Sequence, residues 1–386
     1  MGIRIGIVGA GIGGLAAAAL LARQGHDVTL AERFANPRPL GSGLVVQPVG
    51  LAVLRALNLD QAARDLGAPL VQMLGHSGRR CVLDVHYRPG APGLAMHRAS
   101  LFAVLWQAVQ DAGVTLATGA AITAHHDGWL HRHEAVDLGR FDLVVDASGA
   151  GSVLSPLKPR PLGFGAIWAT VPWPAASALP PNQLTQRYFR ASRMAGVMPV
   201  GRLPHDPTPR AALFWSQSQA EAAAWPQTDF ATWRHEATTF WPDFAAFTAP
   251  LTGAADLTQA RYSHGSLAQP FAPGLAFIGD AAHRASPQLG QGANMALLDA
   301  MALTRALQHG ASDALRRYAA MRRWHRNVYQ GFSALMTPMY QSHSRVLPAL
   351  RDFGLAPLAR MPGVRGVLTA LVSGDVLPPL AGQVWP

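Results

Sequence analysis

The sequence of 386 residues predicts a mixed α/β fold in which a parallel sheet is interleaved with an antiparallel sheet and followed by a helical C-terminal region. Apolar runs at 4–8 and 27–31 flank an alanine-rich stretch at 15–24, which is the strand–helix–strand pattern of a parallel sheet. Between 156 and 270, prolines and tryptophans become frequent, and short alternating runs indicate antiparallel strands. From residue 331 onward the pattern is apolar and helical, with proline breaks.

The composition is that of a large globular protein. Hydrophobic residues make up 49% of the chain and charged residues 14%, a balance too apolar for a disordered protein. The formal charge of +10 comes almost wholly from arginine, since Lys158 is the single lysine, and a basic surface favours anionic partners. No nucleic-acid-binding module is visible, so nucleic acid is not expected as a partner. The single cysteine, Cys81, excludes an internal disulfide and predicts a cytoplasmic protein.

A glycine-rich turn joins the first strand to the first helix. Gly9 permits the tight turn, Gly11 lets backbone amides approach a pyrophosphate, and Gly14 lets the helix pack close to the strand. The N-terminus of that helix adds partial positive charge for the anion. Glu32 ends the second strand, where it would accept hydrogen bonds from a ribose diol and repel a ribose phosphate, so FAD or NAD is favoured over NADP. The predicted contacts in this segment are Gly9, Gly11, Ile12, Gly13, Gly14, Glu32 and Arg33.

A second motif lies in the last third of the chain. Residues 279–283 read Gly-Asp-Ala-Ala-His, followed by Pro287 and by Gly-Gln-Gly-Ala-Asn at 290–294. With this motif the chain resembles the FAD-dependent aromatic hydroxylases, the single-component flavoprotein monooxygenases that include quinone-biosynthesis hydroxylases. The resemblance extends over nearly the whole chain and includes, in the family's order, the glycine turn, Arg98–Leu101 and 146–152. It implies a Rossmann-like FAD-binding domain, with FAD as cofactor and NAD(P)H as co-substrate.

The resemblance implies further cofactor contacts. Asp280 would accept hydrogen bonds from ribityl hydroxyls, and Arg98, which opens a helix, would pair with phosphate or ribityl oxygens. The helix that opens at 290–294 would direct free amides at the pyrimidine edge of the flavin. Gln47 belongs to a loop that lies along the flavin ring in relatives and is the one candidate catalytic residue, although a plain turn before a helix explains it nearly as well. The predicted contacts in this set are Gln47, Arg98, Asp280, Gly290, Gly292, Ala293 and Asn294.

The same markers divide the chain into domains. An FAD-binding domain is expected from segments 1–72, 96–155 and 271–330. An antiparallel-sheet substrate domain is expected from 73–95 and 156–270, and a helical region from 331–386.

The segment 146–152 departs from the family pattern. Family members carry Gly-Ala-Asp-Gly followed by a serine and an arginine, whereas this chain reads Asp-Ala-Ser-Gly-Ala-Gly-Ser, with Ser155 in place of the arginine. The acid is displaced by two positions, which leaves open how NAD(P)H delivers hydride to the flavin.

The expected function is that of an FAD-dependent monooxygenase that hydroxylates an aromatic or quinol-like apolar substrate with dioxygen, through a flavin hydroperoxide. The flavin would carry the chemistry, which explains why no nucleophile, triad or paired carboxylate emerges from the sequence. Apolar side chains of the sheet region, together with a proline of the second motif, are candidates to wall the substrate pocket, although such residues are more often core. These candidates are Trp168, Phe189, Met198, Trp215 and Pro287.

Two other functions stay open from the sequence. One is a flavin dehydrogenase or reductase that does not insert oxygen, and the other is a flavin-binding protein that does not turn over. The apolar, proline-broken C-terminal region resembles that of quinone-type hydroxylases, and this resemblance implies a lipophilic substrate or peripheral contact with a membrane. No transmembrane helix is predicted. The oligomeric state is not predicted.

Three other groups are interpreted as structural. The histidines and the glutamate at 125–134 surround Asp127-Gly128, a hairpin-turn signal, so a solvated hairpin is favoured and no metal is expected. His283 is interpreted as a local structural residue rather than a general base. The arginines of one basic helix most simply form a single solvated face, and they are Arg316, Arg317, Arg322, Arg323 and Arg326.

Overall fold

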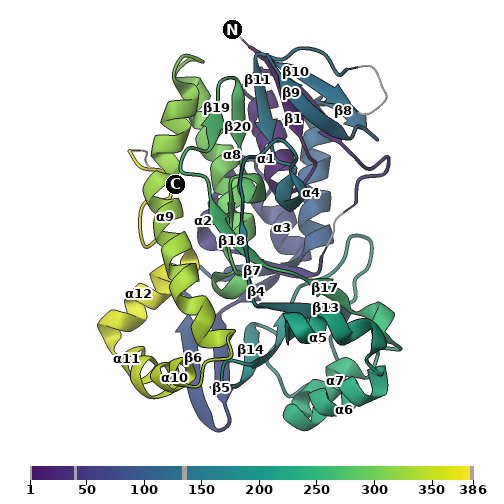
Figure 1. Cartoon of the computed structure of the whole chain (residues 1–386), viewed down its shortest axis with the longest axis vertical. Coiled ribbons are helices and arrows are strands. Elements are labelled where there is room, and N and C mark those ends of the chain that lie inside the picture. The colour runs from purple at the N-terminus through teal and green to yellow at the C-terminus, as the bar shows by residue number, and fades with distance from the viewer. Residues whose placement is uncertain (1, 39–40, 133–136, 383–386) are drawn as a thin grey trace.

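The computed structural model describes residues 2–38, 41–132 and 137–382. Figure 1 shows a six-stranded sheet in the upper half, a seven-stranded sheet in the lower half, and the long helix α9 (Ala314–Tyr340) running along one side past both. This arrangement confirms the predicted α/β class with its parallel sheet, antiparallel sheet and helical C-terminal region.

The six-stranded sheet is parallel except at one edge, where β19 pairs antiparallel with β20. Its spatial order is β19 (Phe271–Ala272), β20 (Leu275–Phe277), β11 (Leu143–Asp146), β1 (Arg4–Val8), β2 (Asp27–Glu32) and β8 (Thr115–Thr118). Because β1 lies between β11 and β2, the glycine turn that follows β1 opens at the carboxyl edge of the sheet, where ligands of such sheets bind.

Helices bury the faces of this sheet. The apolar core joins β1 to three helices, α1 (Ile12–Ala22), α4 (Arg98–Asp111) and α8 (Gly292–Gln308). Helix α1 begins at Ile12, three residues earlier than predicted, because the glycine turn itself supplies the first helical turn after an extended Gly11. Two further helices, α2 (Pro48–Ala56) and α3 (Asp60–Leu66), contribute Val53, Leu54 and Ala63 to the same core.

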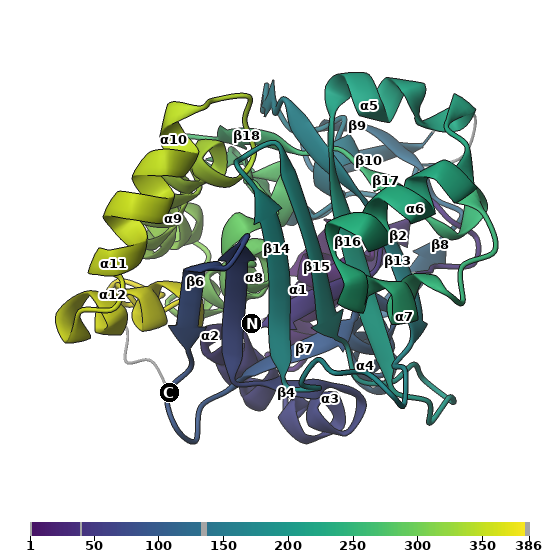
Figure 2. The same cartoon turned by 90° about the horizontal axis from the view of Figure 1, so that it is seen from below.

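The seven-stranded sheet is antiparallel except for the parallel pair of β14 and β5. Its order is β17 (Thr258–Ala260), β13 (Phe164–Pro172), β16 (Arg210–Ser218), β15 (Arg193–Pro199), β14 (Gln183–Phe189), β5 (Gln72–Ser77) and β6 (Arg80–His86). Strand β15 carries a weak local signal, since its Met-Ala-Gly segment lacks the β-branched residues that mark a strand. Figure 2 shows this sheet from below, with helices α5 (Gln219–Ala224), α6 (Phe230–Phe240) and α7 (Ala245–Thr248) on one of its faces.

Smaller elements connect these layers. A three-stranded sheet, β3 (Gly43–Val46), β7 (Gly93–His97) and β4 (Ala68–Leu70), lies between the two large sheets. The short strands are β12 (Arg160–Pro161), β18 (Ser263–Ser266) and β21 (His283–Arg284), and the hairpin is β9 (Ile122–His126) with β10 (Trp129–Arg132). The C-terminal helices are α10 (Val346–Ala349), a π-helical turn (Leu350–Leu355), α11 (Ala356–Leu358) and α12 (Pro362–Ser373). None of the described helices combines the length and the apolar character that crossing a bilayer requires.

Candidate cofactor and substrate site

Two positions of the turn after β1 have no room for a residue with a Cβ atom. Gly9 has φ of +100°, and a Cβ added there would lie 2.6 Å from Cα of Ser148. A Cβ on Gly14 would lie 1.9 Å from the carbonyl oxygen of Gly9. Gly11 differs, because its backbone is extended and its added Cβ would find only the oxygen of Ala147, at 4.0 Å. Gly11 therefore borders open space at the carboxyl edge of the sheet.

Helices α1 and α8 lie side by side, as both views show (Figures 1 and 2). Gly13 makes this possible, since its added Cβ would lie 3.2 Å from the Cβ of Ala296. Neither helix has a side-chain cap or an acidic residue in its first turn. The free amides of both helices therefore form one region of positive potential, suited to an anionic ligand. Ile12 is buried beneath it, whereas Gly292 and Ala293 open α8 with at least partial exposure.

Glu32 is fixed next to the glycine turn. Its Oε2 accepts a hydrogen bond from the amide of Ala10 at 2.8 Å, and its Oε1 accepts one from the amide of Phe34 at 3.0 Å. Each carboxylate oxygen retains capacity for a second donor, which fits the hydroxyls of a ribose. Arg33 is exposed and lies over the ring of Phe34 at 4.7 Å.

Arg98 and Asp280 are opposite charges without protein partners. The Arg98 guanidinium makes no hydrogen bond or ion pair with the residues that the structure describes, and the same holds for the Asp280 carboxylate. Burial lowers the pKa of Arg98, and the nearby charge of Asp280 opposes that fall. A cation and an anion left free in one region fit a ligand that carries both phosphate and hydroxyl groups.

Asn294 holds the strand β3 against α8. Its Oδ1 accepts from the amide of Gln47 at 2.8 Å, and its Nδ2 donates to the carbonyls of Val45 at 2.9 Å and Gly290 at 3.0 Å. The side chain is fully buried and its hydrogen-bonding groups are all used. Only the backbone amide of Asn294 is therefore free to face a ligand.

Gln47 presents a buried amide with one end unpaired. Tyr87 donates a hydrogen bond of 2.7 Å to its Oε1, while its Nε2 has no partner. A Cβ added to Gly290 would lie 3.4 Å from that Nε2, so the amide faces the turn that precedes α8. A buried amide group without a partner costs about 1–3 kcal/mol. A bound ligand that accepts a hydrogen bond from Nε2 would remove this cost. Tyr87, which lies outside every motif, was missed from the sequence.

One face of the seven-stranded sheet covers β3. A Cβ on Gly43 would lie 2.5 Å from Cγ1 of Val200 and 2.8 Å from Cε of Met198. Trp168 lies on the same face, with its ring 4.9 Å from that of Phe214, so the structure brings Trp168 and Met198 to the side of the sheet that faces β3. Pro287 is exposed in the turn that leads to Gly290 and α8.

Two predicted pocket residues do not belong to this face. Trp215 follows Phe214 along β16, and successive side chains of a strand point to opposite faces. It packs instead under α6, edge-on to Trp233 and to Phe240 at 5.5 Å. Phe189 is 54% exposed at the end of β14. Trp215 and Phe189 therefore do not lie on the face that Trp168 and Met198 share.

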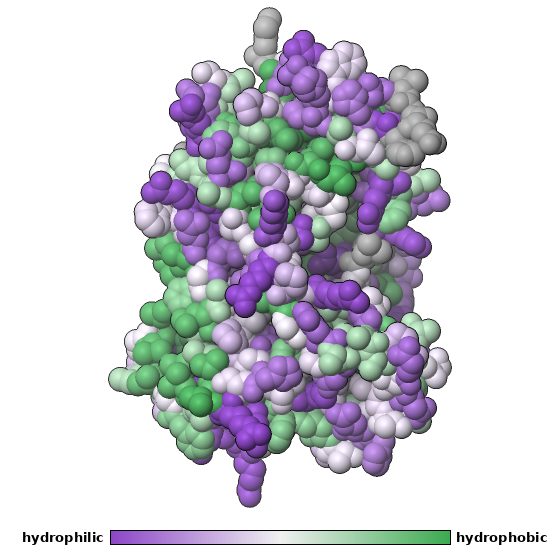
Figure 3. Space-filling view, viewed as in Figure 1, coloured by the Kyte–Doolittle hydropathy of each residue, from purple (hydrophilic) through white to green (hydrophobic). Residues whose placement is uncertain are grey.

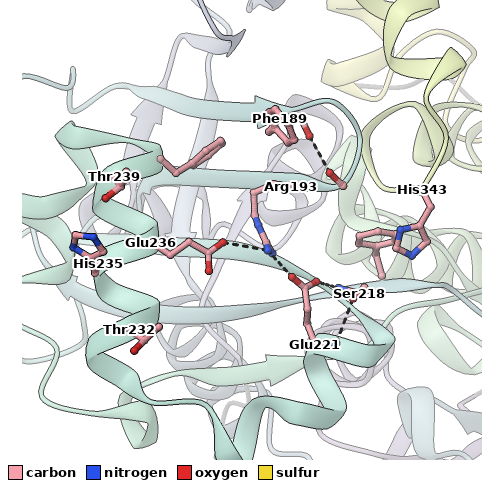
Figure 4. A pocket seen from close by; sticks show the side chains of 12 residues that line it. Phe189, Arg193, Ser218, Glu221, Thr232, His235, Glu236, Thr239 and His343 are labelled. Carbon is pink, nitrogen blue, oxygen red and sulfur yellow. Dashed lines mark hydrogen bonds and ion pairs between the residues drawn. The ribbon is translucent and has the colours of Figure 1, made fainter.

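Phe189 instead borders a separate pocket of about 900 Å³, between the end of the sheet and α6 (Figure 4). Arg193 lies at its centre and pairs with Glu221 and Glu236, and His343 closes the opposite side. The pocket shares no residue with the glycine turn or with the turn before α8.

Comparison with known proteins shows which family has this geometry. The model of the FAD binding domain family matches residues 3–327. The chain belongs to this FAD-binding family. A probable 2-heptyl-3-hydroxy-4(1H)-quinolone synthase of Rhodococcus erythropolis is 30% identical over 93% of the chain and 92% of its own length. The 3-amino-4-hydroxybenzoate 2-monooxygenase of Streptomyces cremeus is 28% identical over 83% of each chain.

Solved structures share the fold of this FAD-binding enzyme. The oxygenase of 2-methyl-3-hydroxypyridine-5-carboxylic acid superposes with a TM-score of 0.79 at 20% identity, covering 97% of this chain and 96% of the other. HpxO of Klebsiella pneumoniae, complexed with FAD and uric acid, superposes with a TM-score of 0.82 at 20% identity, covering 97% and 98%. The relatives include named monooxygenases of aromatic compounds, and this chain is an FAD-dependent oxidoreductase of the monooxygenase type.

The FAD-binding fold carries a buried charge network that the sequence did not reveal. The Asp299 carboxylate contacts Nε2 of His283 at 2.6 Å, and it accepts hydrogen bonds from the amide of Gly279 at 3.0 Å and from Nε of Arg322 at 2.7 Å. Burial raises the pKa of Asp299, but His283 and Arg322 outweigh it and hold that pKa well below its usual range. The network ties the turn of the second motif to α8 and α9, and His283 has the structural role expected of it.

Arg322 and Arg326 correct the interpretation of the basic helix. Both are buried, with exposures of 0% and 3%, whereas Arg316 and Arg323 are exposed as expected. Arg322 also donates to the carbonyl oxygen of Pro379 at 2.7 Å. The inner stripe of α9 is polar because it faces Asp299, so hydrophobic periodicity could not locate it.

The segment 146–152, which departs from the sequence pattern of the family, has its own set of hydrogen bonds. The displaced acid, Asp146, is fully buried and accepts hydrogen bonds from Oγ of Ser148 at 2.6 Å and Oγ of Ser152 at 2.5 Å. Ser155, in the arginine position, donates to the carbonyl of Ala281 at 2.6 Å. The acid thus organises its own segment. Arg284, which follows the second motif, donates to the carbonyl of Ala150 at 2.7 Å, so an arginine from the other side joins the segment to that motif.

The histidine-rich segment forms the predicted hairpin. Strands β9 and β10 pair across Asp127 and Gly128, which both have positive φ. In the described part of the chain, no group of three or more histidine, cysteine or acidic side chains is arranged to hold a metal ion. His133 and Glu134 lie outside the described residues.

Proposed function

We propose that this FAD-dependent enzyme hydroxylates a neutral, apolar aromatic ring, with dioxygen as the oxygen source and NAD(P)H as the reductant. Bound FAD supplies the redox chemistry and the activation of dioxygen. The protein holds the pyrophosphate at Gly11, the ribose at Glu32, the ribityl chain at Asp280 and Arg98, and the ring beside Gln47 and the N-terminus of α8. In this proposal 1–72, 96–155 and 271–330 form the FAD-binding domain, 73–95 and 156–270 the substrate domain, and 331–386 the helical region.

The sheet face over β3, whose single charged residue is already ion-paired, carries the proposal for the substrate. The register of β13 to β16 determines which side chains point the same way as Met198. These are Phe164, Ala166, Trp168, Thr170, Pro172, Leu184, Gln186, Tyr188, Met194, Arg210, Ala212, Phe214, Ser216 and Ser218. Arg210, at the end of β16, is the one charged residue among them, and it is already paired with Asp206 at 2.6 Å. Since a buried carboxylate needs a cationic partner, this face favours a neutral ring over a benzoate or a nicotinate.

The names of the relatives span both kinds of substrate. A heptyl-quinolone is neutral and apolar, whereas 3-amino-4-hydroxybenzoate carries a carboxylate. Side chains of the kind found on this face, such as Trp168, Phe214 and Met198, exclude water and hold a flat apolar ring by contact alone. The proposal therefore places the substrate nearer to the alkylated heteroaromatic class.

Labelled dioxygen tests the reaction. Purified enzyme with NADH or NADPH is supplied with a 2-alkyl-4-quinolone or with 3-amino-4-hydroxybenzoate under ¹⁸O₂. We expect substrate-dependent oxidation of the nicotinamide, one labelled oxygen in the product, and a kcat/KM at least about tenfold higher for the neutral ring, the discrimination that one unpaired buried polar group produces. A product without label would indicate a dehydrogenase. A flavin that no nicotinamide bleaches would indicate a non-catalytic flavoprotein.

The single cysteine supports a cytoplasmic location. An apolar substrate partitions into lipid, so the proposal includes reversible contact with a membrane.

A further inference from the structure

The C-terminal helices expose a continuous set of large apolar side chains. Thirteen such side chains are exposed in the described part of the chain, and eight of them come from residues 335–367, which is far from a random scatter. We call these eight the C-terminal apolar surface: Leu335, Val346, Leu350, Phe353, Leu358, Met361, Val364 and Val367. Figure 3 shows it as the green area at the lower left, over α10 to α12.

The C-terminal apolar surface is part of the packed structure, because its inner side contacts the body of the protein. Arg351 is 1% exposed, donates to the carbonyl of Met339 at 3.0 Å, and lies over the rings of Tyr188 and Tyr340, both at 5.0 Å. At the far end of α12, Leu371 is buried in the body of the protein. The outward direction of the apolar side chains is therefore fixed by the fold.

The unpaired charge around the surface is of one sign. Arg345, Arg360 and Arg365 are exposed and make no ion pair with described residues, and Arg80 lies over the ring of Phe353 at 4.3 Å. Asp352 binds Arg351, and Asp375 binds Arg88. Asp84, which lines a hollow with Arg360 and Arg365, accepts from Gln72 at 2.7 Å and contacts His86 at 2.9 Å. Among the described residues, the rim charges without a partner are therefore positive.

The combination of an apolar centre and a cationic rim distinguishes between two binding partners for this surface, a second copy of the chain and an anionic lipid surface. A second copy related by twofold symmetry would bring the same arginines against one another, which is unfavourable. An anionic lipid surface would meet them with opposite charge while its acyl region takes up the apolar side chains. The helices are too short to cross a bilayer, so contact would stay at its surface.

We propose that the C-terminal apolar surface binds reversibly to the interface of a membrane that contains anionic lipid. The same segment reaches the cofactor site, because Gln291, at the start of α8, donates from Nε2 to the carbonyl of Val372 in α12 at 2.8 Å. Docking on lipid would thus bring the enzyme's site close to apolar molecules dissolved in the bilayer. The binding itself depends on this surface alone and not on the identity of the substrate.

Vesicle flotation of the purified holoprotein tests the proposal. Vesicles of phosphatidylcholine alone are compared with vesicles containing 30% phosphatidylglycerol, in about 50 mM and 500 mM salt, because salt screens the electrostatic part. We expect at least tenfold more binding to the anionic vesicles at low salt, and a marked loss at high salt. Absence of binding to the anionic vesicles would overturn the proposal.

Matched variants identify the surface. The triple change Phe353→Ser, Val364→Ser and Val367→Ser, and separately Arg360→Glu, are expected to reduce binding several-fold or more. Trp129→Ser and Arg64→Glu remove an exposed apolar side chain and an exposed arginine elsewhere, and should bind as the parent does. Retained flavin absorbance and thermal melting show that each variant is folded. Equal binding by all variants would refute the assignment.

Light scattering distinguishes the competing occupant. The proposal expects the same molar mass for the parent and for the triple serine variant. A dimer that dissociates in the serine variant, in a protein that does not float with vesicles, would show that the surface is a contact between copies and overturn the lipid proposal.

Discussion

Tyr87 and Gln47 form a buried pair in which the phenol donates to the amide Oε1 over 2.7 Å, which leaves Nε2 as the unpaired end of that amide. Burial raises the pKa of Tyr87, so the phenol keeps its proton at any working pH. Tyr87 directly follows β6 of the seven-stranded sheet, and Gln47 is the N-cap of α2 in the cofactor half. The hydrogen bond thus joins the two halves of the protein.

The Gln47 amide is expected to bind the cofactor ring. Gln47→Met keeps the volume of the side chain but removes the amide, so the dissociation constant of FAD should rise about two- to tenfold, the worth of one hydrogen bond. Tyr87→Phe should move it in the same direction by less, because only the orientation of the amide is lost. Quenching of FAD fluorescence on titration into apoprotein measures both, and two unchanged constants would contradict this role.

The glycine turn offers a test that separates binding from folding. In Gly11→Ala the new Cβ points into open space, so the apoprotein should melt at an unchanged temperature while FAD binds at least about tenfold more weakly, since that space is where the pyrophosphate would approach. In Gly14→Ala the new Cβ meets the Gly9 carbonyl, so stability should fall as well. Normal FAD affinity in Gly11→Ala would remove the pyrophosphate from this turn.

Removal of Arg322 should destabilise the protein strongly. Arg322→Met leaves the buried Asp299 with one partner fewer, and breaking a buried ion pair of this kind costs about 3–5 kcal/mol. Arg323→Met changes the exposed neighbour and should shift the free energy of unfolding by less than about 0.5 kcal/mol. Urea denaturation compares the two, and similar losses in both would be inconsistent with the network.

Two buried histidines predict a loss of stability in mild acid. Burial and the nearby Arg210 and Arg98 lower the pKa of His97 to about 4, and burial with Arg322 lowers that of His325 to about 3. In the unfolded chain both would take up a proton near pH 6.5. Each therefore stabilises the fold fully above pH 6.5, and this contribution is lost as pH falls toward 4 for His97 and toward 3 for His325.

Well below pH 6.5 the slope of that loss approaches at most about 1.4 kcal/mol per pH unit for buried His325, and it is smaller for half-buried His97, whose charge solvent partly screens. Urea titrations between pH 7 and pH 5 measure it. His97→Asn keeps a residue able to cap α4 and should flatten the profile. An equally steep profile in this variant would assign the acid sensitivity to other groups.

The two faces of β13 and β16 predict different consequences for two tryptophans. Trp168→Phe alters the face over β3 and should change KM for the aromatic substrate. It also removes the indole N–H that donates to the Tyr262 hydroxyl at 2.9 Å, so a lower melting temperature is expected as well. Trp215→Phe alters the packing under α6 and should lower the melting temperature with little effect on KM. Steady-state kinetics and thermal melting of both variants decide, and the opposite pattern in KM would reverse the assignment of the faces.

Local signals predicted the cofactor half of the fold well. The glycine turn, the acid at the end of β2 and the start of α8 each depend on neighbours in sequence, so spacing alone located them. The second motif begins in the turn after β20 and ends at the start of α8, as the sequence predicted.

Contacts between distant segments could not be predicted in the same way. Tyr87 and Asp299 belong to no local pattern, and their partners are 40 and 23 residues away along the chain. An aspartate within the apolar α8 and the polar residues Arg322 and His325 at helical spacing were the available signals. The sheet face on which Trp215 lies could not be predicted either, because composition does not say which face of β16 turns toward the cofactor half.

The order of the strands has a consequence for how the protein is made. Strand β1 pairs with β11, and β11 pairs in turn with β20, which follows much later in the sequence. Because β1, β2, β8 and β11 all precede residue 147, these four strands can pair with one another before β20 has been synthesised. The free edge of β11 then stays open until β20 follows, and an open strand edge can pair with another chain. A nascent chain that has reached β11 but not β20 is therefore the form most exposed to misassembly.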